Sequence, residues 1–303
     1  MTTLRSLPTS LLLPCVMVVA LHAQPAIEGP YLGVVVDRDG TATQLTGIPG
    51  TARAIRIGPS RAYGSAVTAS HRRFVVAVSN HTLLLPAPLP AIPVTRDSGD
   101  LAVSPLAKYI AWRESASDTV DLYRLPDLVH RAIAVTSCGF DASEAISVAI
   151  SDAGTLLLAG DDRVVALGPD PAARAFVPVA LRLVRFTPNG DLAFAYAPTL
   201  RAVVAVHTGT MGLDTLFSDA DGLNTPNELA ISDATTLWVS QSAGAHLLRF
   251  DLPTRTLTPY TLDSSGQLRS IGAPGLYLWS PSALLDLRAG APTLSLLAVD
   301  DTH

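Results

Sequence analysis

The stretch that decides the fold is residues 231–262, which read ISDATTLWVSQSAGAHLLRFDLPTRTLTPYTL. A short apolar run ends at Ile231, a polar turn follows, and three further apolar runs are separated by more turn-forming residues. Gly, Asp, Ser and Pro favour turns because each suits a reversal of the backbone or hydrogen-bonds to it locally. Short apolar runs with turn signals every 8–12 residues are typical of an all-β fold.

The same pattern recurs along the chain, and one unit cannot bury both of its faces alone. Four strands in about 40 residues are typical of a β-propeller blade, and blades that pack on one another close into a ring. Six units start at intervals of 36 to 47 residues, at Val67, Val103, Ile150, Phe186, Ile231 and Ile271.

An incomplete unit precedes these six. Residues 31–46, YLGVVVDRDGTATQLT, carry Asp39-Gly40 at their centre, which is a strong signal for a β-hairpin, and residues 53–57 predict a third strand. The sequence therefore predicts a single β-propeller of four-stranded blades over residues 31–300, with seven blades. Six blades are the alternative, in which this hairpin is an appendage or part of the closing blade. No sustained helical stripe follows residue 25, so we expect almost no helix.

The N-terminus has the pattern of a secretory signal peptide. Arg5 precedes the apolar stretch Leu11–Leu21, which is too short to span a membrane, and Ala23 is a possible cleavage point. We expect residues 1–23 to be removed and the protein to be exported to the periplasm or the exterior. Residues 24–30 then form a short lead and residues 301–303 a tail.

The composition excludes several classes of protein. Hydrophobic residues make up 48% and charged residues 16%, which is the balance of a folded chain. The net charge of −5 argues against nucleic acid as a partner, and no later apolar run has the length of a transmembrane helix. Lys108 is the only lysine, a usage typical of a GC-rich bacterium. We expect a monomer whose partner is an unidentified protein, glycan or small molecule.

Few residues point to chemistry. Cys138 is the only cysteine left after residues 1–23 are removed, so we expect no internal disulfide and a small buried side chain there. The segment SDADGLN, starting at Ser218, gathers the oxygen ligands Asp219, Asp221 and Asn224. Calcium prefers such oxygens, but their spacing differs from that of a calcium-binding helical loop. A solvated loop between blades is the other interpretation.

One blade resembles a known family. Residues 226–230, PNELA, and 237–242, LWVSQS, stand where sugar-lactonase (gluconolactonase-like) and NHL-type propellers read P-N-G-L-A and L-Y-V-A-D-S. The resemblance implies a propeller, and in the lactonases it implies that Asn227 helps to hold a divalent metal in a central channel. Glu28, in an E-G-P motif, is similar to another metal ligand of that family. Glu228 replaces the family's glycine, and Gln241 its aspartate.

Two functions follow from this sequence. The first is an exported, non-catalytic propeller that binds a ligand or a protein and carries no cofactor. The alternative is a metal-dependent, sugar-lactonase-like hydrolase, in which calcium or zinc polarises a carbonyl in the central channel. Asn227, Asp219, Asp221 and Asn224 are the candidate binding residues under either hypothesis.

Overall fold

The computed structural model describes residues 31–36, 42–47, 52–57, 65–72, 74–86, 88–169, 174–233, 235–244, 246–262, 266–280 and 283–299. Over these residues the chain is nearly all β, with two single-turn 3-10 helices, η1 (Thr136–Cys138) and η2 (Asp219–Asp221). The predicted all-β fold is confirmed. The predicted signal peptide, lead and tail lie outside the described residues.

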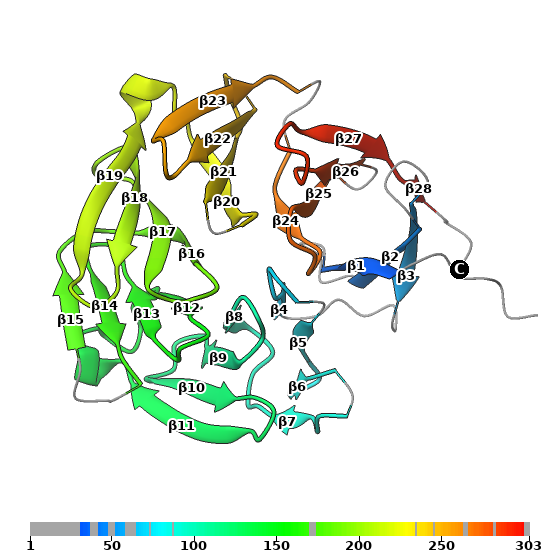
Figure 1. The fold of residues 1–303 in the computed structure, drawn as a ribbon. Coiled ribbons are helices and arrows are strands. Elements are labelled where there is room, and N and C mark those ends of the chain that lie inside the picture. Colours follow the sequence, from blue (N-terminus) through cyan, green and yellow to red (C-terminus); the bar gives the residue numbers. More distant parts are fainter. Residues whose placement is uncertain are drawn as a thin grey trace, which may run out of the picture.

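The described strands form seven four-stranded sheets (Figure 1). After the N-terminal strands, the first sheet in chain order contains β4 Ser65–Thr68, β5 Val75–Ser79, β6 Thr82–Leu84 and β7 Ile92–Pro93. The second contains β8 Gly99–Val103, β9 Tyr109–Glu114, β10 Thr119–Arg124 and β11 Val129–Ala134. The third contains β12 Ser147–Ile150, β13 Leu156–Ala159, β14 Val164–Leu167 and β15 Arg174–Val177. The fourth contains β16 Arg182–Phe186, β17 Leu192–Ala197, β18 Ala202–His207 and β19 Gly212–Ser218. The fifth contains β20 Pro226–Ile231, β21 Thr236–Gln241, β22 Leu247–Asp251 and β23 Thr256–Tyr260. The sixth contains β24 Arg269–Ser270, β25 Leu276–Ser280, β26 Ala283–Asp286 and β27 Thr293–Leu296.

The remaining sheet joins the two ends of the described chain. It consists of β1 Tyr31–Val36, β2 Ala42–Thr46, β3 Arg53–Ile57 and β28 Ala298–Val299, and we call it the appended sheet. The two strands of the predicted hairpin, β1 and β2, pair antiparallel, and β3 is the predicted third strand; the predicted turn at Asp39-Gly40 lies outside the described residues. β28 pairs with β3 in parallel, whereas the other strand pairs are antiparallel.

Six of the seven sheets surround the axis of the propeller. Their first strands, β4, β8, β12, β16, β20 and β24, each lie at an edge of their sheet and together line a central cavity. None of the described residues of the appended sheet lines this cavity. The propeller therefore has six blades; the prediction of seven is wrong, and the six-blade alternative is correct.

The ring closes where the last blade meets the first. The Ser270 hydroxyl, in β24, donates a hydrogen bond to the carbonyl of Ala69, directly after β4, at 3.4 Å. The last and first blades thus meet directly, and β1 lies beside this junction, in contact with β4. There Gly33 approaches Ile271 so closely that a Cβ atom on Gly33 would lie 1.9 Å from the Ile271 carbonyl oxygen.

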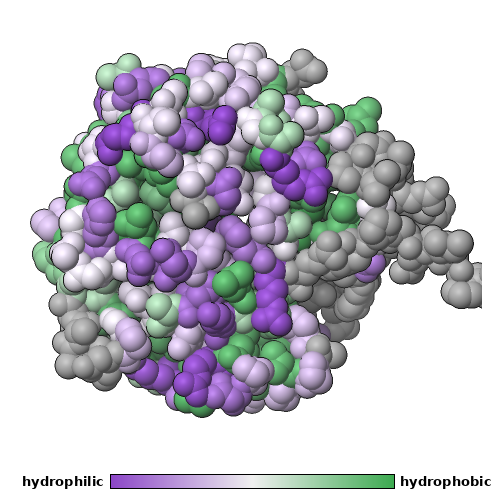
Figure 2. All heavy atoms as spheres, in the orientation of Figure 1, coloured by the Kyte–Doolittle hydropathy of each residue, from purple (hydrophilic) through white to green (hydrophobic). Residues whose placement is uncertain are grey.

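The core lies between neighbouring blades, as the two-faced apolar pattern of the middle strands requires. All four residues of both β13 and β14 are buried. The largest buried side chains include Trp112 and Trp238. Cys138 is buried, as predicted. On the face shown in Figure 2, hydrophilic and hydrophobic residues are interspersed, and hydrophilic ones lie around the middle of the ring.

Candidate functional site

The central cavity has a volume of about 320 Å³. This is at the lower end of the roughly 300–1,000 Å³ that is usual for small-molecule sites. Because its six lining strands are edge strands, they offer backbone N–H and C=O groups that no neighbouring strand of the same sheet uses. A rigid ring with a polar inner edge is suited to hold a small ligand that makes hydrogen bonds.

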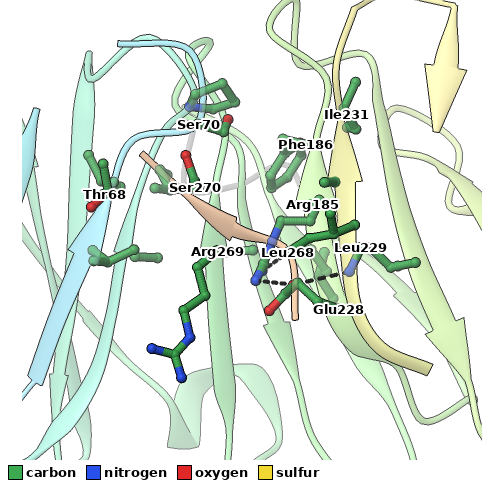
Figure 3. A pocket seen from close by; sticks show the side chains of 18 of the residues that line it. Thr68, Ser70, Arg185, Phe186, Glu228, Leu229, Ile231, Leu268, Arg269 and Ser270 are labelled. Carbon is green, nitrogen blue, oxygen red and sulfur yellow. Dashed lines mark hydrogen bonds and ion pairs between the residues drawn. The ribbon is translucent and has the colours of Figure 1, made fainter. Parts of the chain in front are cut away.

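Charge is confined to one half of the cavity wall. Among the described lining residues, only Arg185, Glu228 and Arg269 are charged, and they lie on the consecutive inner strands β16, β20 and β24 (Figure 3). The opposite half, from the β4, β8 and β12 blades, is uncharged. Its lining residues are Val67, Thr68, Ser70, Leu101, Ala102, Val103, Pro105, Val148, Ala149 and Ile150.

Arg185 and Glu228 form an ion pair across neighbouring blades. The Arg185 Nη2 lies 2.6 Å from the Glu228 Oε1, and their side chains are 43% and 22% exposed. The Arg185 Nη1 donates to the carbonyl of Val184 at 2.8 Å, and the backbone N–H of Leu229 donates to the Glu228 Oε1 at 3.1 Å. A partly exposed ion pair of this kind contributes about 1 kcal/mol or less to the free energy of unfolding. Its contribution to stability is therefore small.

Both strands of this pair are irregular immediately before the charged residue. The register between β16 and β17 shifts between Arg182 and Arg185, and that between β20 and β21 shifts between Pro226 and Glu228. Leu183, inside the first irregularity, has a φ of 57°, a left-handed conformation that costs a non-glycine residue about 1–2 kcal/mol. Bulges re-aim side chains and are frequent beside active sites, and local strain of this kind is concentrated at functional sites.

A histidine lies beside the uncharged half. Ser70 lines the cavity, and its hydroxyl is hydrogen-bonded to the Nδ1 of His71 at 2.9 Å. The Nε2 of His71 is buried without a hydrogen-bond partner in the described part of the chain. Burial lowers the pKa of His71, and the carboxylates of Asp152 and Asp233 oppose that shift. The imidazole is therefore neutral at pH 7.

Tyr277 closes the wall between the β20 and β24 blades. Its hydroxyl donates to the carbonyl of Ile231 at 3.3 Å, and the residue is buried. Burial raises the pKa of this phenol well above its ordinary value, and the charge of Asp233 adds to the shift. Tyr277 is a neutral, fixed part of the wall.

The acidic residues predicted from the SDADGLN segment lie at the outer rim of a blade. η2 follows the outermost strand β19, and the Asp221 carboxylate accepts hydrogen bonds from the backbone N–H and the hydroxyl of Ser218 at 2.9 and 3.2 Å. Asp219 is paired with Arg201 at 3.5 Å. The backbone N–H of Asn224 donates to the Oε1 of Gln241 at 2.9 Å. These contacts build a turn.

Asn227 lies within the irregularity of β20, and it is the next residue, Glu228, that lines the cavity. Over the described residues, no group of three or more His, Cys, Asp or Glu side chains could hold a metal. Glu228 is already bound to Arg185, and both other charges of the wall are cationic. The described donors therefore do not fit a divalent metal in the cavity, and a binding role for Asn227 and the η2 acids stays a prediction.

Sequence reasoning did not single out Arg185 or Arg269, and it noted Glu228 only as a departure from a motif. A signal was present. Each of the three stands within three residues before the start of a repeat, at Phe186, Ile231 or Ile271.

No helix in the described ranges combines the length and apolar character needed to cross a membrane. No family model matches the chain, so the NHL and lactonase resemblance gains no support there. No curated protein matches it either.

Several solved structures are similar in fold. The β-propeller domain of Cps50 (Swd1) from Myceliophteria thermophila has 12% identity and a TM-score of 0.55, over 88% of this chain and 96% of that one. A functionally unknown protein from Desulfotomaculum acetoxidans DSM 771 has 14% identity and a TM-score of 0.55, over 90% and 100%. KlHsv2 with its loop 6CD replaced by a Gly-Ser linker has 11% identity and a TM-score of 0.52, over 84% and 88%. At these identities the likeness concerns the fold alone, and the chain is a β-propeller.

Proposed function

We propose that this chain is an exported bacterial β-propeller that acts as a non-catalytic binding scaffold, with the central cavity as its small-ligand site. The observation that carries the proposal is the cavity of about 320 Å³ at the axis. Six edge strands converge there, and three of them bring the charged residues Arg185, Glu228 and Arg269. Ligand sites favour such concave places with a few converging polar groups.

The state of the charged groups supports binding rather than catalysis. Glu228 is the only acid of the described wall, and Arg185 and the Leu229 N–H both hold its Oε1. A carboxylate held in this way fixes an arginine in place. A general acid or base would instead need to reach a proton on the substrate.

Export rests on the sequence. The charged start and apolar stretch within residues 1–23 support a cleaved signal peptide, and the near absence of lysine supports a bacterial source.

A thermal melt of the purified protein against a panel of small anionic, neutral and cationic metabolites tests the proposal. A ligand at about 100 times its Kd stabilises the native state by about 2.7 kcal/mol, which raises the Tm measurably. Val148→Trp, in the wall on β12, is expected to abolish the rise. The matched control is Val129→Trp, because Val129 lies on the outer strand β11 and its side chain is half exposed. This variant should still show the rise in Tm when the ligand is added. A rise that survives Val148→Trp contradicts the cavity as the site.

A further inference from the structure

One outer strand of the propeller lacks the features that keep the edges of sheets from pairing. β27 is the outermost strand of the sixth blade, at the rim of the ring in Figure 1, and no other described strand pairs with its outer edge. We propose that β27 is a self-association surface, on which β27 of a second copy of this chain pairs antiparallel to form a two-fold dimer. β27 contributes no residue to the central cavity, so this surface is independent of the ligand site.

The outer edge of β27 is open to pairing. Natural proteins protect an edge strand with charged residues or proline, because its free N–H and C=O groups can otherwise pair with another chain. β27 reads Thr-Leu-Ser-Leu and has neither a charge nor a proline. The outermost strands of the other five blades each have such a residue: Pro93 in β7, Arg131 in β11, Arg174 in β15, Asp214 in β19 and Pro259 in β23.

Two leucines of β27 are exposed on one face of the sheet. Leu294 is 36% exposed and Leu296 is 80% exposed, the highest value among the large hydrophobic side chains of the described residues. Leu294 lies opposite Leu285 of β26, and Leu296 lies opposite Ala283, so these four side chains share a face. Leu285 is buried in the core between the fifth and sixth blades. The exposed leucines therefore extend a buried apolar surface to the edge of the blade.

The sequence of β27 is complementary to its own copy. In an antiparallel pair centred on Ser295, Leu294 of one copy lies opposite Leu296 of the other, and the two-fold axis repeats this contact. The leucines of both copies then cover one another on one face of a continuous sheet made of two blades. No charge meets a like charge in this arrangement. Self-pairing of β11 or β19 would instead bring Arg131 or Asp214 near its own copy.

The dimer is expected to be weak. β27 has four residues, and small interfaces belong to weak or transient complexes. The net charge of −5 on each copy also opposes association. We therefore expect a Kd of about 10–100 µM, at which the protein is a monomer when dilute and a dimer when concentrated.

The test is analytical ultracentrifugation of the purified protein at about 1 to 300 µM and about 0.15 M salt. The average mass should rise from that of one chain toward that of two. Leu296→Lys should weaken association about tenfold or more, because the dimer contains this contact twice. The matched control is Leu200→Lys, because Leu200 is 48% exposed and lies between β17 and β18. It should associate as the unsubstituted protein does, and both variants should keep its Tm.

A second variant tests the register of the pair. Leu294→Glu alone should also weaken association, because it places a charge opposite Leu296 of the other copy. An equimolar mixture of Leu294→Glu and Leu296→Lys should associate more tightly than either variant alone, because the new carboxylate and the new ammonium group then lie opposite each other. A variant that merely misfolds would not be rescued in this way.

Several outcomes would overturn the proposal. A protein that remains monomeric up to about 300 µM, or a Leu296→Lys variant that associates as well as the unsubstituted protein, would exclude β27 as a self-association surface. Equal loss of association in Leu200→Lys would exclude it too. Growth beyond a dimer would contradict two-fold pairing, which closes on itself. A mixture that associates no more tightly than the single variants would contradict the antiparallel register.

Discussion

The Ser270 hydroxyl donates a hydrogen bond to the carbonyl of Ala69, which lies 201 residues earlier in the chain. This contact joins the last blade to the first. Gly33 of β1 approaches Ile271, the residue directly after Ser270, so the appended sheet packs against this junction.

The contact between Gly33 and Ile271 allows a test of how the appended sheet is seated. A Cβ on Gly33 would lie 1.9 Å from the Ile271 carbonyl oxygen, so Gly33→Ala must push the two backbones apart. We expect it to lower the free energy of unfolding by about 2–3 kcal/mol, measured by urea denaturation. Gly209→Ala is the control, because nothing lies within 4 Å of its Cβ position. Equal stability of the two variants would show that Gly33 of β1 does not pack against Ile271.

His71 predicts a pH dependence of stability. Burial lowers its pKa from 6.5 in the folded state, so the unfolded chain binds the proton more readily. The resulting stability is present above about pH 6.5 and is lost as the pH falls through that value toward the folded-state pKa. His71→Asn should therefore reduce the fall in Tm between about pH 7 and 5.

The control for this experiment is His207→Asn. His207 is partly exposed and paired with Asp214 at 2.7 Å, outside the cavity. This variant should retain the wild-type loss of stability in acid more closely than His71→Asn does. An unchanged acid dependence in His71→Asn would remove His71 as its source.

Divalent metals test the hydrolase alternative. We expect no saturable rise in Tm when calcium or zinc is added after EDTA treatment, because the described wall pairs its one acid with an arginine. The Asn227→Ala variant should have the same Tm with and without added calcium or zinc. A rise of several degrees that Asn227→Ala abolishes would instead support a lactonase-like metal site.

Export predicts a defined mature N-terminus. Expression in a bacterial host should yield periplasmic or secreted protein whose intact mass corresponds to a start at Gln24, after Ala23. Val18→Arg places a charge in the apolar stretch and should leave unprocessed protein inside the cell. Full-length protein of unchanged mass in both cases would contradict the signal peptide.

The blade pattern could be predicted from the sequence because it is local: each turn and each apolar run lies within a few residues of its partners. The number of blades depends on how segments far apart in the chain meet, as Ser270 meets Ala69 and β1 meets β4, and the spacing of the repeats does not reveal such contacts. The positions of Arg185 and Glu228, shortly before the start of a repeat, mark them as residues of an inner strand, but their ion pair could not be predicted. The registers of β16 and β20 both shift just before these residues, and the sequence does not reveal such shifts.

The parallel pairing of β28 with β3 has a mechanical consequence. Arg53 pairs with Ala298 and Ala54 with Val299, so the first and last strands of the described chain belong to one sheet. Tension applied between residues 31 and 299 is borne across the four strands of that sheet, and the six blades carry none of it until those strands separate. The strands of the appended sheet are thus the first to separate under tension, and until they separate the ring of blades stays closed.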